Sequence, residues 1–157
     1  MSRIPVYQSE AMQRSLHAVA LSWIGTPFIG HACIKGAGVD CVHLVANVLI
    51  EAGCKFVFNP PPYSLDGGHH LGLSKIVTWI EGSGHFNIIP DFPVNIGDVL
   101  LFRIGKVAHH IGVKVTPATF LHALRKHGVI ESNVGDPTWA RRLTCAYRPM
   151  EETKSNL

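Results

Sequence analysis

The spacing of apolar residues changes once along this chain, near residue 91, and that change limits the class of fold. Before it, apolar residues recur three and four positions apart, as they do on one face of a helix. After it, the pattern has a period of two within short segments that are separated by turns containing glycine or proline. Helices followed by a meander of strands predict an α+β domain in which the helices pack on an antiparallel sheet.

The expected elements follow from these patterns and from the residues that end them. Helices are expected over residues 9–23, 40–52 and 69–81, with Ser9 and Asp40 as the N-caps of the first two. Strands are expected over residues 98–103, 107–115, 119–124, 129–132 and 143–148. The proline-rich residues 54–65 are expected to form an ordered surface loop, and Asp98 is expected to hold the turn before the first strand.

Length and composition exclude several classes of protein. With 157 residues, the chain is predicted to be one domain over residues 1–150, followed by a flexible tail over 151–157. The net charge is only +3 and the basic residues form no dense run, so no nucleic-acid partner is expected. The sequence has neither a secretory signal nor an apolar run near the roughly 20 residues of a membrane span. The chain is therefore expected to be made in the cytoplasm, where its four cysteines would be free thiols.

One of these cysteines has a distinctive setting, the stretch from Gly36 to Val45. A glycine-rich loop leads to Asp40, a residue type that caps helices, and Cys41 follows in the first turn of the expected helix. The helix dipole favours thiolate over thiol at that position, and cysteine nucleophiles are activated in such places. Cys41 is therefore the candidate nucleophile, with a buried structural thiol as the alternative.

A cysteine nucleophile needs a base, and the expected strands offer histidines for that role. His109 alternates with apolar residues typical of a core-facing side, which predicts a half-buried histidine beside the cleft. His110 shares its face with Ala108 and Gly112, whose small side chains would leave room for a helix end and a substrate. His110 is therefore the expected base. If the next hairpin brings His122 onto the same face, His122 can fix the tautomer of His110.

Five segments, taken in order, resemble the NlpC-type cysteine peptidases. They are Trp23 to Phe28, Gly38 to Cys41 with the helix that follows, Ile96 to Phe102, His110 to Val113, and Phe120 to Ala123. These enzymes are papain-like bacterial and phage proteins that cut cell-wall peptides. The resemblance implies a circularly permuted papain-like core, in which a helix bearing the cysteine packs on an antiparallel sheet bearing the histidines.

The resemblance also implies roles for three residues. Cys41 matches the nucleophile of the family, His110 the base and His122 the third polar residue of a Cys-His-His triad. The implied activity is hydrolysis of amide bonds in peptidoglycan peptide stems, without a cofactor or a metal ion. The short form of the chain is most similar to phage-tail or prophage members, so tail or lysis-machinery proteins and association with a virion are expected.

Asp40 is also expected to line the cleft. The sequence departs from the family pattern at two places in this expected cleft. Phe28 stands where many members have a tyrosine near the oxyanion site, so the oxyanion would rest on the backbone N–H of Cys41. Val42 and His43 stand where many members have Ser-Gly, which predicts a different substrate preference.

Three alternatives stay open at the level of sequence. The same thiol chemistry serves acyl transfer or thioester hydrolysis on lipids, and a tail-assembly module could retain this fold with weakened chemistry. A metal site is conceivable at His69 and His70, joined by His31, His43 or His85, but the sequence lacks the tight Cys/His spacing of a zinc site. His69 and His70 are therefore expected to line the cleft or cap a helix.

Overall fold

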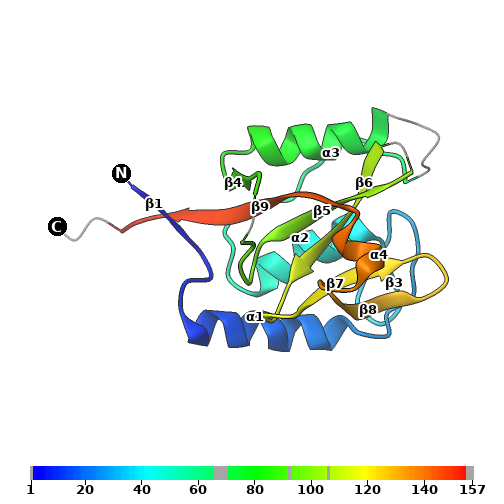
Figure 1. Cartoon of the computed structure of the whole chain (residues 1–157), viewed down its shortest axis with the longest axis horizontal. Coiled ribbons are helices and arrows are strands. Elements are labelled where there is room, and N and C mark those ends of the chain that lie inside the picture. The colour runs from blue at the N-terminus through cyan, green and yellow to red at the C-terminus, as the bar shows by residue number, and fades with distance from the viewer. Residues whose placement is uncertain (1, 66–70, 92, 106, 155–157) are drawn as a thin grey trace.

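A computed structural model describes residues 2–65, 71–91, 93–105 and 107–154, without the side chains of 71–74 and 107–109 (Figure 1). The helices are α1 (Glu10–Trp23), α2 (Cys41–Glu51), α3 (Leu71–Gly82) and the short α4 (Pro137–Ala140). The strands are β1 (Arg3–Pro5), β2 (Cys33–Ile34), β3 (Gly38–Val39), β4 (Phe86–Ile89), β5 (Val99–Ile104), β6 (Val107–Lys114), β7 (Thr119–Leu124), β8 (Gly128–Asn133) and β9 (Leu143–Glu152). The predicted α+β fold, with helices first and an antiparallel sheet after them, is confirmed.

The main sheet has the strand order β1-β9-β5-β6-β7-β8, and β4 also pairs with β9. All of these pairs are antiparallel. Strands β5 to β8 lie in chain order, which is the meander that the period of two predicts. Figure 1 shows β1 and the end of β9 projecting from the body of the molecule, to the side where both termini lie.

Helices α1, α2 and α3 cover one face of this sheet. The main core joins Leu16 of α1, Leu44 of α2 and Ile76 of α3 to Ile111 and Val113 of β6, all of them at most 2% exposed. Burial of these side chains is the largest favourable contribution to folding, at about 25 cal/mol for each Å² of apolar surface removed from water. The same packing positions α2 against β6.

A smaller apolar cluster lies on the opposite face. Because side chains alternate along a strand, Leu100 and Phe102 of β5 point away from the helices, and they pack with Phe120 and Ala146. Trp139 of α4 packs against this cluster. The sheet therefore has a helical cover on one face and an aromatic layer on the other.

The ends of the first two helices follow the predicted signals. The Ser9 side chain accepts a hydrogen bond from the Met12 N–H, and Asp40 accepts one from the N–H of His43 at 2.8 Å. After α2, Gly53 adopts a positive φ of 110°, a conformation that glycine supports without strain. The boundaries of α2 were thus predictable to within one residue from its capping residues.

Strands β1 and β4 were not predicted, and they change one expected boundary. Each pairs with β9, β1 across most of the chain's length and β4 across about 60 residues, so local periodicity gives little indication of either. Strand β9 continues through Glu151 and Glu152, which pair with Ile4 and Arg3 of β1. These two residues of the expected tail belong to the sheet, because β1 supplies them with a hydrogen-bonding partner.

Residues 54–65 contain neither a helix nor a strand, as expected, but they are more than a surface loop. Cys54, Phe56 and Tyr63 are each at most 9% exposed and pack in the main core. The segment therefore crosses the helical side of the domain while burying some of its side chains. Among the helices in the described part of the chain, none has the length and apolarity needed to cross a membrane.

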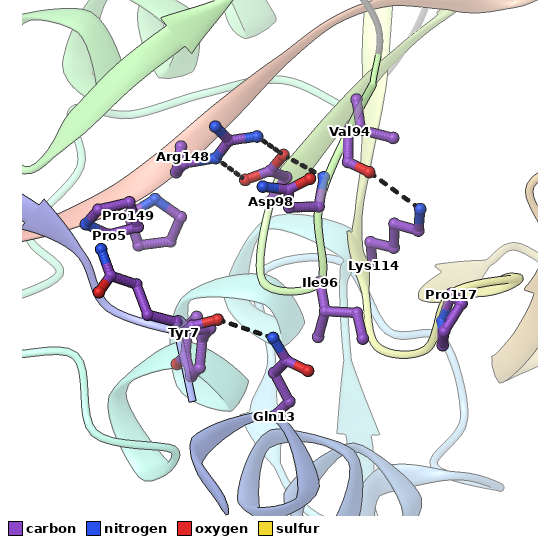
Figure 2. A pocket seen from close by; sticks show the side chains of 12 residues that line it. Pro5, Tyr7, Gln13, Val94, Ile96, Asp98, Lys114, Pro117, Arg148 and Pro149 are labelled. Carbon is purple, nitrogen blue, oxygen red and sulfur yellow. Dashed lines mark hydrogen bonds and ion pairs between the residues drawn. The ribbon is translucent and has the colours of Figure 1, made fainter. Parts of the chain in front are cut away.

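Asp98, just before β5, ties its turn to β9, as Figure 2 shows. Its carboxylate accepts hydrogen bonds from Nε and Nη2 of Arg148, both at 2.9 Å, and from the N–H of Asn95 at 2.7 Å. The predicted role of Asp98 in holding the turn is confirmed, although Arg148 was not foreseen. Nearby, Lys114 donates to the carbonyl oxygen of Val94 at 3.0 Å, and these residues line a cavity of about 540 Å³.

Candidate active site

Cys41 is the first residue of α2, directly after the N-cap Asp40. Its side chain lies in the main core and is only 3% exposed. The sequence correctly predicted the position of this thiol on the helix. The depth at which it is buried depends on how α2 packs against the sheet.

The charge state of the Cys41 thiol differs from the one that its helix position predicts. Burial raises its pKa to about 12, and repulsion from the Asp40 carboxylate acts in the same direction. Hydrogen bonds from the backbone N–H groups of Ile111, Cys41 and Val42 lower the pKa, and the last two are the contribution of the helix start. Burial outweighs them, so the pKa of this thiol lies above its ordinary value although the helix start lowers it.

Asp40 is completely buried beside this thiol, and its carboxylate is saturated with hydrogen bonds. Oδ2 accepts from the N–H of His31 at 2.8 Å and from the hydroxyl of Tyr63 at 2.6 Å, while Oδ1 lies 3.0 Å from Nδ1 of His43. Burial by itself would raise the pKa of Asp40, but the hydrogen bonds from His43 and Tyr63 hold that pKa below its usual value. A charged carboxylate therefore stands next to the candidate nucleophile.

Tyr63 connects the 54–65 segment to this carboxylate. Its Oη lies 2.6 Å from both Asp40 Oδ2 and His43 Nδ1, so a hydroxyl that donates to the carboxylate can accept from Nδ1–H. The ring of His31, a residue with a positive φ of 62°, packs 4.8 Å from the Tyr63 ring. Residues 54–65 were expected to form a surface loop, and the sequence carries no signal for the hydrogen bond from Tyr63 to Asp40.

The two predicted strand histidines lie together on the face of the aromatic layer. Nε2 of His110 is 2.9 Å from Nδ1 of His122, and Nε2 of His122 is 2.7 Å from Oγ of Ser132 on β8. His110 and His122 therefore share one face, an arrangement that the sequence permitted. Ser132 was not foreseen, because no motif identifies a single serine on a strand.

Aromatic rings surround this pair of histidines. The Phe120 ring lies 4.4 Å and the Trp139 ring 4.8 Å from that of His122, and Trp139 also lies 5.5 Å from His110. Burial lowers the pKa of His122 from 6.5 to about 4, so this imidazole is neutral near pH 7. Trp139 and α4, which were not predicted, cover the pair on this side.

Gly112 permits the close approach of the two strands. A Cβ at this position would lie 2.8 Å from the carbonyl oxygen of Leu121 and 2.9 Å from a ring carbon of Phe120. The space beside Gly112 is therefore filled by β7, whereas the sequence predicted that a helix end and a substrate would occupy it. Helix α2 packs instead on the side of Ile111, where the larger apolar residues are.

Strand β6 brings the thiol close to the histidine pair. The N–H of Ile111 hydrogen-bonds to the sulfur of Cys41, and the preceding residue on that strand is His110. Cys41, His110 and His122 are 3%, 5% and 0% exposed, respectively. All three candidate catalytic residues are thus buried, with the Cys41 sulfur at the backbone of the residue after His110 and the two histidines on the face of the aromatic layer.

The other expected cleft residues have more varied surroundings. Phe28 forms a backbone bridge with Val39, two residues before Cys41, and the Arg125 guanidinium lies 5.5 Å from its ring. Val42 is 2% exposed and packs in the main core, so in this structure it faces no open cleft. The side chain of His109 lies outside the described part of the chain.

The remaining expectations concern a conceivable metal site and the state of the four cysteines. Within the described ranges, no three His, Cys, Asp or Glu side chains are grouped as metal ligands would be. His69 and His70, where a metal site was conceivable, lie outside those ranges. Cys33, Cys41, Cys54 and Cys145 are all free thiols.

The fold and this arrangement of residues agree with a known family. Residues 25–148 match the NlpC/P60 family, which is well over half of the 157-residue chain. The chain therefore belongs to the NlpC/P60 family.

Two curated relatives share sequence with the chain. "Murein DD-endopeptidase MepS/Murein LD-carboxypeptidase" of Escherichia coli K12 is 35% identical over 57 residues, which are 36% of this chain and 30% of that protein. A Haemophilus influenzae protein named "Probable endopeptidase" is 25% identical over 121 residues, 76% of this chain and 63% of that protein. The chain thus matches less than two thirds of the length of either relative.

Solved structures share the fold at lower identity. NlpC2 of Trichomonas vaginalis has a TM-score of 0.64 at 15% identity, covering 94% of this chain and 49% of that one. An NLP/P60 family protein of Staphylococcus aureus has a TM-score of 0.62 at 18% identity, covering 94% and 44%. The NlpC/p60 domain of the peptidoglycan hydrolase SagA has a TM-score of 0.55 at 18% identity, covering 85% and 96%. At such identities the likeness is one of fold.

Proposed function

We propose that this protein is a cysteine peptidase that hydrolyses amide bonds in the peptide stems of peptidoglycan. The observation that carries the proposal is the hydrogen-bonded pair of His110 on β6 and His122 on β7, together with the hydrogen bond that Ile111, the residue after His110, donates to the sulfur of Cys41. A thiol, a histidine and a second group that orients this histidine are the parts that thiol-dependent acyl transfer requires.

In the proposed reaction, His110 acts as the general base and Cys41 as the nucleophile. His110 takes the thiol proton as the sulfur attacks the carbonyl carbon, and the N–H of Cys41 donates to the oxygen that becomes negative. The C–N bond then breaks, and the leaving amine takes the proton from His110. Water attacks the thioester while giving a proton to His110, and that proton returns to the sulfur as the acid product leaves.

The raised pKa of the Cys41 thiol determines how this sequence starts. A thiol with a pKa of about 12 is protonated near pH 7, so no thiolate waits for the substrate. Proton transfer to His110 therefore accompanies the attack. His122 is neutral and orients His110 through its Nδ1, without gaining or losing a charge itself.

The substrate class rests on the names of relatives. MepS is named as a murein endopeptidase and carboxypeptidase, and SagA as a peptidoglycan hydrolase. By similarity, we assign peptidoglycan peptide stems to this chain as its substrate. His43, 21% exposed at its side chain and held by Asp40 and Tyr63, stands next to the nucleophile, where it can affect which stem is accepted.

The proposal can be tested by incubating the purified chain with muropeptides and analysing the products by mass spectrometry. Cys41→Ala is expected to abolish peptide release, whereas Cys33→Ala, which removes an exposed thiol, retains it. Hydrolysis that persists in Cys41→Ala would overturn the assignment. Transfer of acyl groups to lipid instead of peptide release would favour the acyltransferase alternative. A wild-type chain that releases nothing would favour an assembly module.

Association with a phage particle is a separate part of the proposal. It extends the resemblance to the family that the sequence suggested, and it includes tail or lysis proteins as partners. Synthesis in the cytoplasm belongs to the same proposal. Co-purification of the chain with phage particles, compared with a free cytoplasmic pool, is the measurement that tests it.

A further inference from the structure

Hydrogen-bonded polar side chains extend beyond the two histidines to a third strand. His110, His122 and Ser132 lie on β6, β7 and β8; Nε2 of His110 is 2.9 Å from Nδ1 of His122, and Nε2 of His122 is 2.7 Å from Oγ of Ser132. In the register of β7 with β8, Ser132 is opposite Phe120, so it is the diagonal neighbour of His122 on the same face. The row is therefore built into the pairing of the strands.

The direction of the hydrogen bonds along this row determines whether His110 can act as a base. If Nε2–H of His122 donates to Ser132, then Nδ1 of His122 accepts from Nε2–H of His110. A neutral His110 that carries its proton on Nε2 has a basic Nδ1. If Ser132 donates to His122 instead, every bond reverses, and a neutral His110 carries its proton on Nδ1.

We propose that Ser132 is a positioning residue whose Oγ accepts the Nε2–H of His122 and thereby holds His110 in the tautomer that is basic at Nδ1. The inference rests on the proposed function, in which His110 receives the thiol proton. After that transfer, Nε2–H of His110 must donate to His122, and Nε2–H of His122 must donate to Ser132. The acceptor orientation of Ser132 is thus the one that needs no rearrangement during the reaction.

The surroundings of His122 make Ser132 the hydrogen-bond partner of its Nε2. His122 is 0% exposed, and the rings of Phe120 and Trp139 lie within 4.8 Å of its own ring. An imidazole nitrogen buried in this way has a strong requirement for a partner, because an unsatisfied buried polar group is costly. Ser132 is half-buried, so its hydroxyl hydrogen can point to solvent while Oγ accepts.

The first test needs no substrate. Long-range 1H–15N NMR spectra of protein with labelled histidines distinguish protonated from unprotonated ring nitrogens, and comparison with His122→Gln identifies the signals of His122. The expected result is protonated Nε2 and unprotonated Nδ1 in the wild type and in Ser132→Thr. Ser132→Ala is expected to show both tautomers or the reversed one. A protonated Nδ1 in the wild type would overturn the inference, whatever the protein hydrolyses.

The second test measures turnover. In Ser132→Ala, kcat is expected to fall about tenfold with little change in KM, because one oriented hydrogen bond is lost away from the substrate. Ser132→Thr retains the hydroxyl and is expected to restore kcat. Ser83→Ala is the matched control, since it removes a hydroxyl that donates to the Ile80 carbonyl outside the site.

The outcomes separate this inference from the proposed function. An unchanged His122 tautomer together with an unchanged kcat in Ser132→Ala would contradict the role of Ser132 but leave the peptidase intact. A wild-type protein without hydrolysis would contradict the peptidase, while the NMR result still decides what Ser132 does. If Ser132→Ala fails to fold, the tautomer of wild-type His122 alone supports or overturns the inference.

Discussion

The nucleophile side and the base side of the candidate site are buried to a similar degree in very different surroundings. Cys41 is 3% exposed and lies beside the Asp40 carboxylate, which four hydrogen-bonding contacts hold in place. His122 is 0% exposed and lies among aromatic rings, with Ser132 as a neutral partner. One side is therefore organised by a charge and the other by apolar packing.

Both sides nevertheless favour the uncharged form of a titratable group, the Cys41 thiol on one side and the His122 imidazole on the other. Burial raises the pKa of the Cys41 thiol to about 12 and lowers the pKa of His122 to about 4. A helix N-terminus stabilises a negative charge by about 0.3–1 kcal/mol at exposed sites, which does not match the cost of desolvating a thiolate. The comparison teaches that a helix start identifies the nucleophile, whereas its charge state depends on burial.

The largest expected effect lies on the base side and is the change in the free energy of unfolding with pH. The pKa of His122 is about 4 in the folded state and 6.5 as the ordinary value. Between these values the unfolded chain binds more protons, so the free energy of unfolding falls as the pH falls through this window, by up to about 3 kcal/mol. Above pH 6.5 this contribution is fully present. Urea unfolding measured between pH 7 and pH 4 is the check.

A variant isolates this contribution from the other groups that titrate. His122→Gln is expected to lose stability less steeply below pH 6.5, whereas the exposed His127→Gln keeps the wild-type slope. Titration of the His122 ring by NMR gives its pKa without unfolding the protein. A pKa near 6.5 would show that apolar packing on the base side does not exclude the charge.

The parts of the site that were predictable have local signals. Asp40 and Cys41 form a cap and a first helical residue within two positions, and the hydrogen bond to His43 lies three residues away. His110 and His122 were found because alternation along two strands and one hairpin bring them together. In each case, short-range geometry determines the contact.

The parts that were missed depend on long-range packing. Tyr63 reaches Asp40 from 23 residues away, through a segment without regular structure. Ser132 and Trp139 have their roles only because β8 and α4 return to the same face of the sheet. The raised pKa of Cys41 was missed for the same reason, since the sequence gives the helix start and not the depth of burial. The α+β class, by contrast, follows from periodicity alone.

The next largest effect lies on the nucleophile side and tests the role of the Asp40 carboxylate. Tyr63→Phe removes the hydroxyl that donates to Asp40 at 2.6 Å and leaves the ring packing in place. Hydrogen bonds to charged groups contribute about 1.5–3 kcal/mol, so urea unfolding at pH 7 is expected to show a loss of about 2 kcal/mol. Because the Asp40 carboxylate is then less well held beside Cys41, kcat is expected to fall as well.

Tyr147→Phe provides the matched control for this variant. The Tyr147 hydroxyl donates to Glu81 at 2.9 Å, so the substitution also removes a phenol-to-carboxylate hydrogen bond, but outside the site. A similar loss of stability with unchanged kcat is expected. If Tyr63→Phe changed stability but not kcat, the hydrogen bonds to Asp40 would be structural only, and the nucleophile side would not depend on its charge.

The smallest effect is the order in which the thiols react, and it tests the uncharged state of Cys41 directly. Iodoacetamide reacts with thiolates, and Cys33 is exposed whereas Cys41 is buried with a pKa of about 12. Peptide mapping at pH 8 is therefore expected to show Cys33 labelled at least about tenfold faster than Cys41. Labelling of Cys41 is expected to accelerate continuously up to pH 10, and in urea both thiols react at similar rates. Rapid labelling of Cys41 with a plateau below pH 7 would reveal a thiolate at rest, and the two sides of the site would then differ in charge as well as in surroundings.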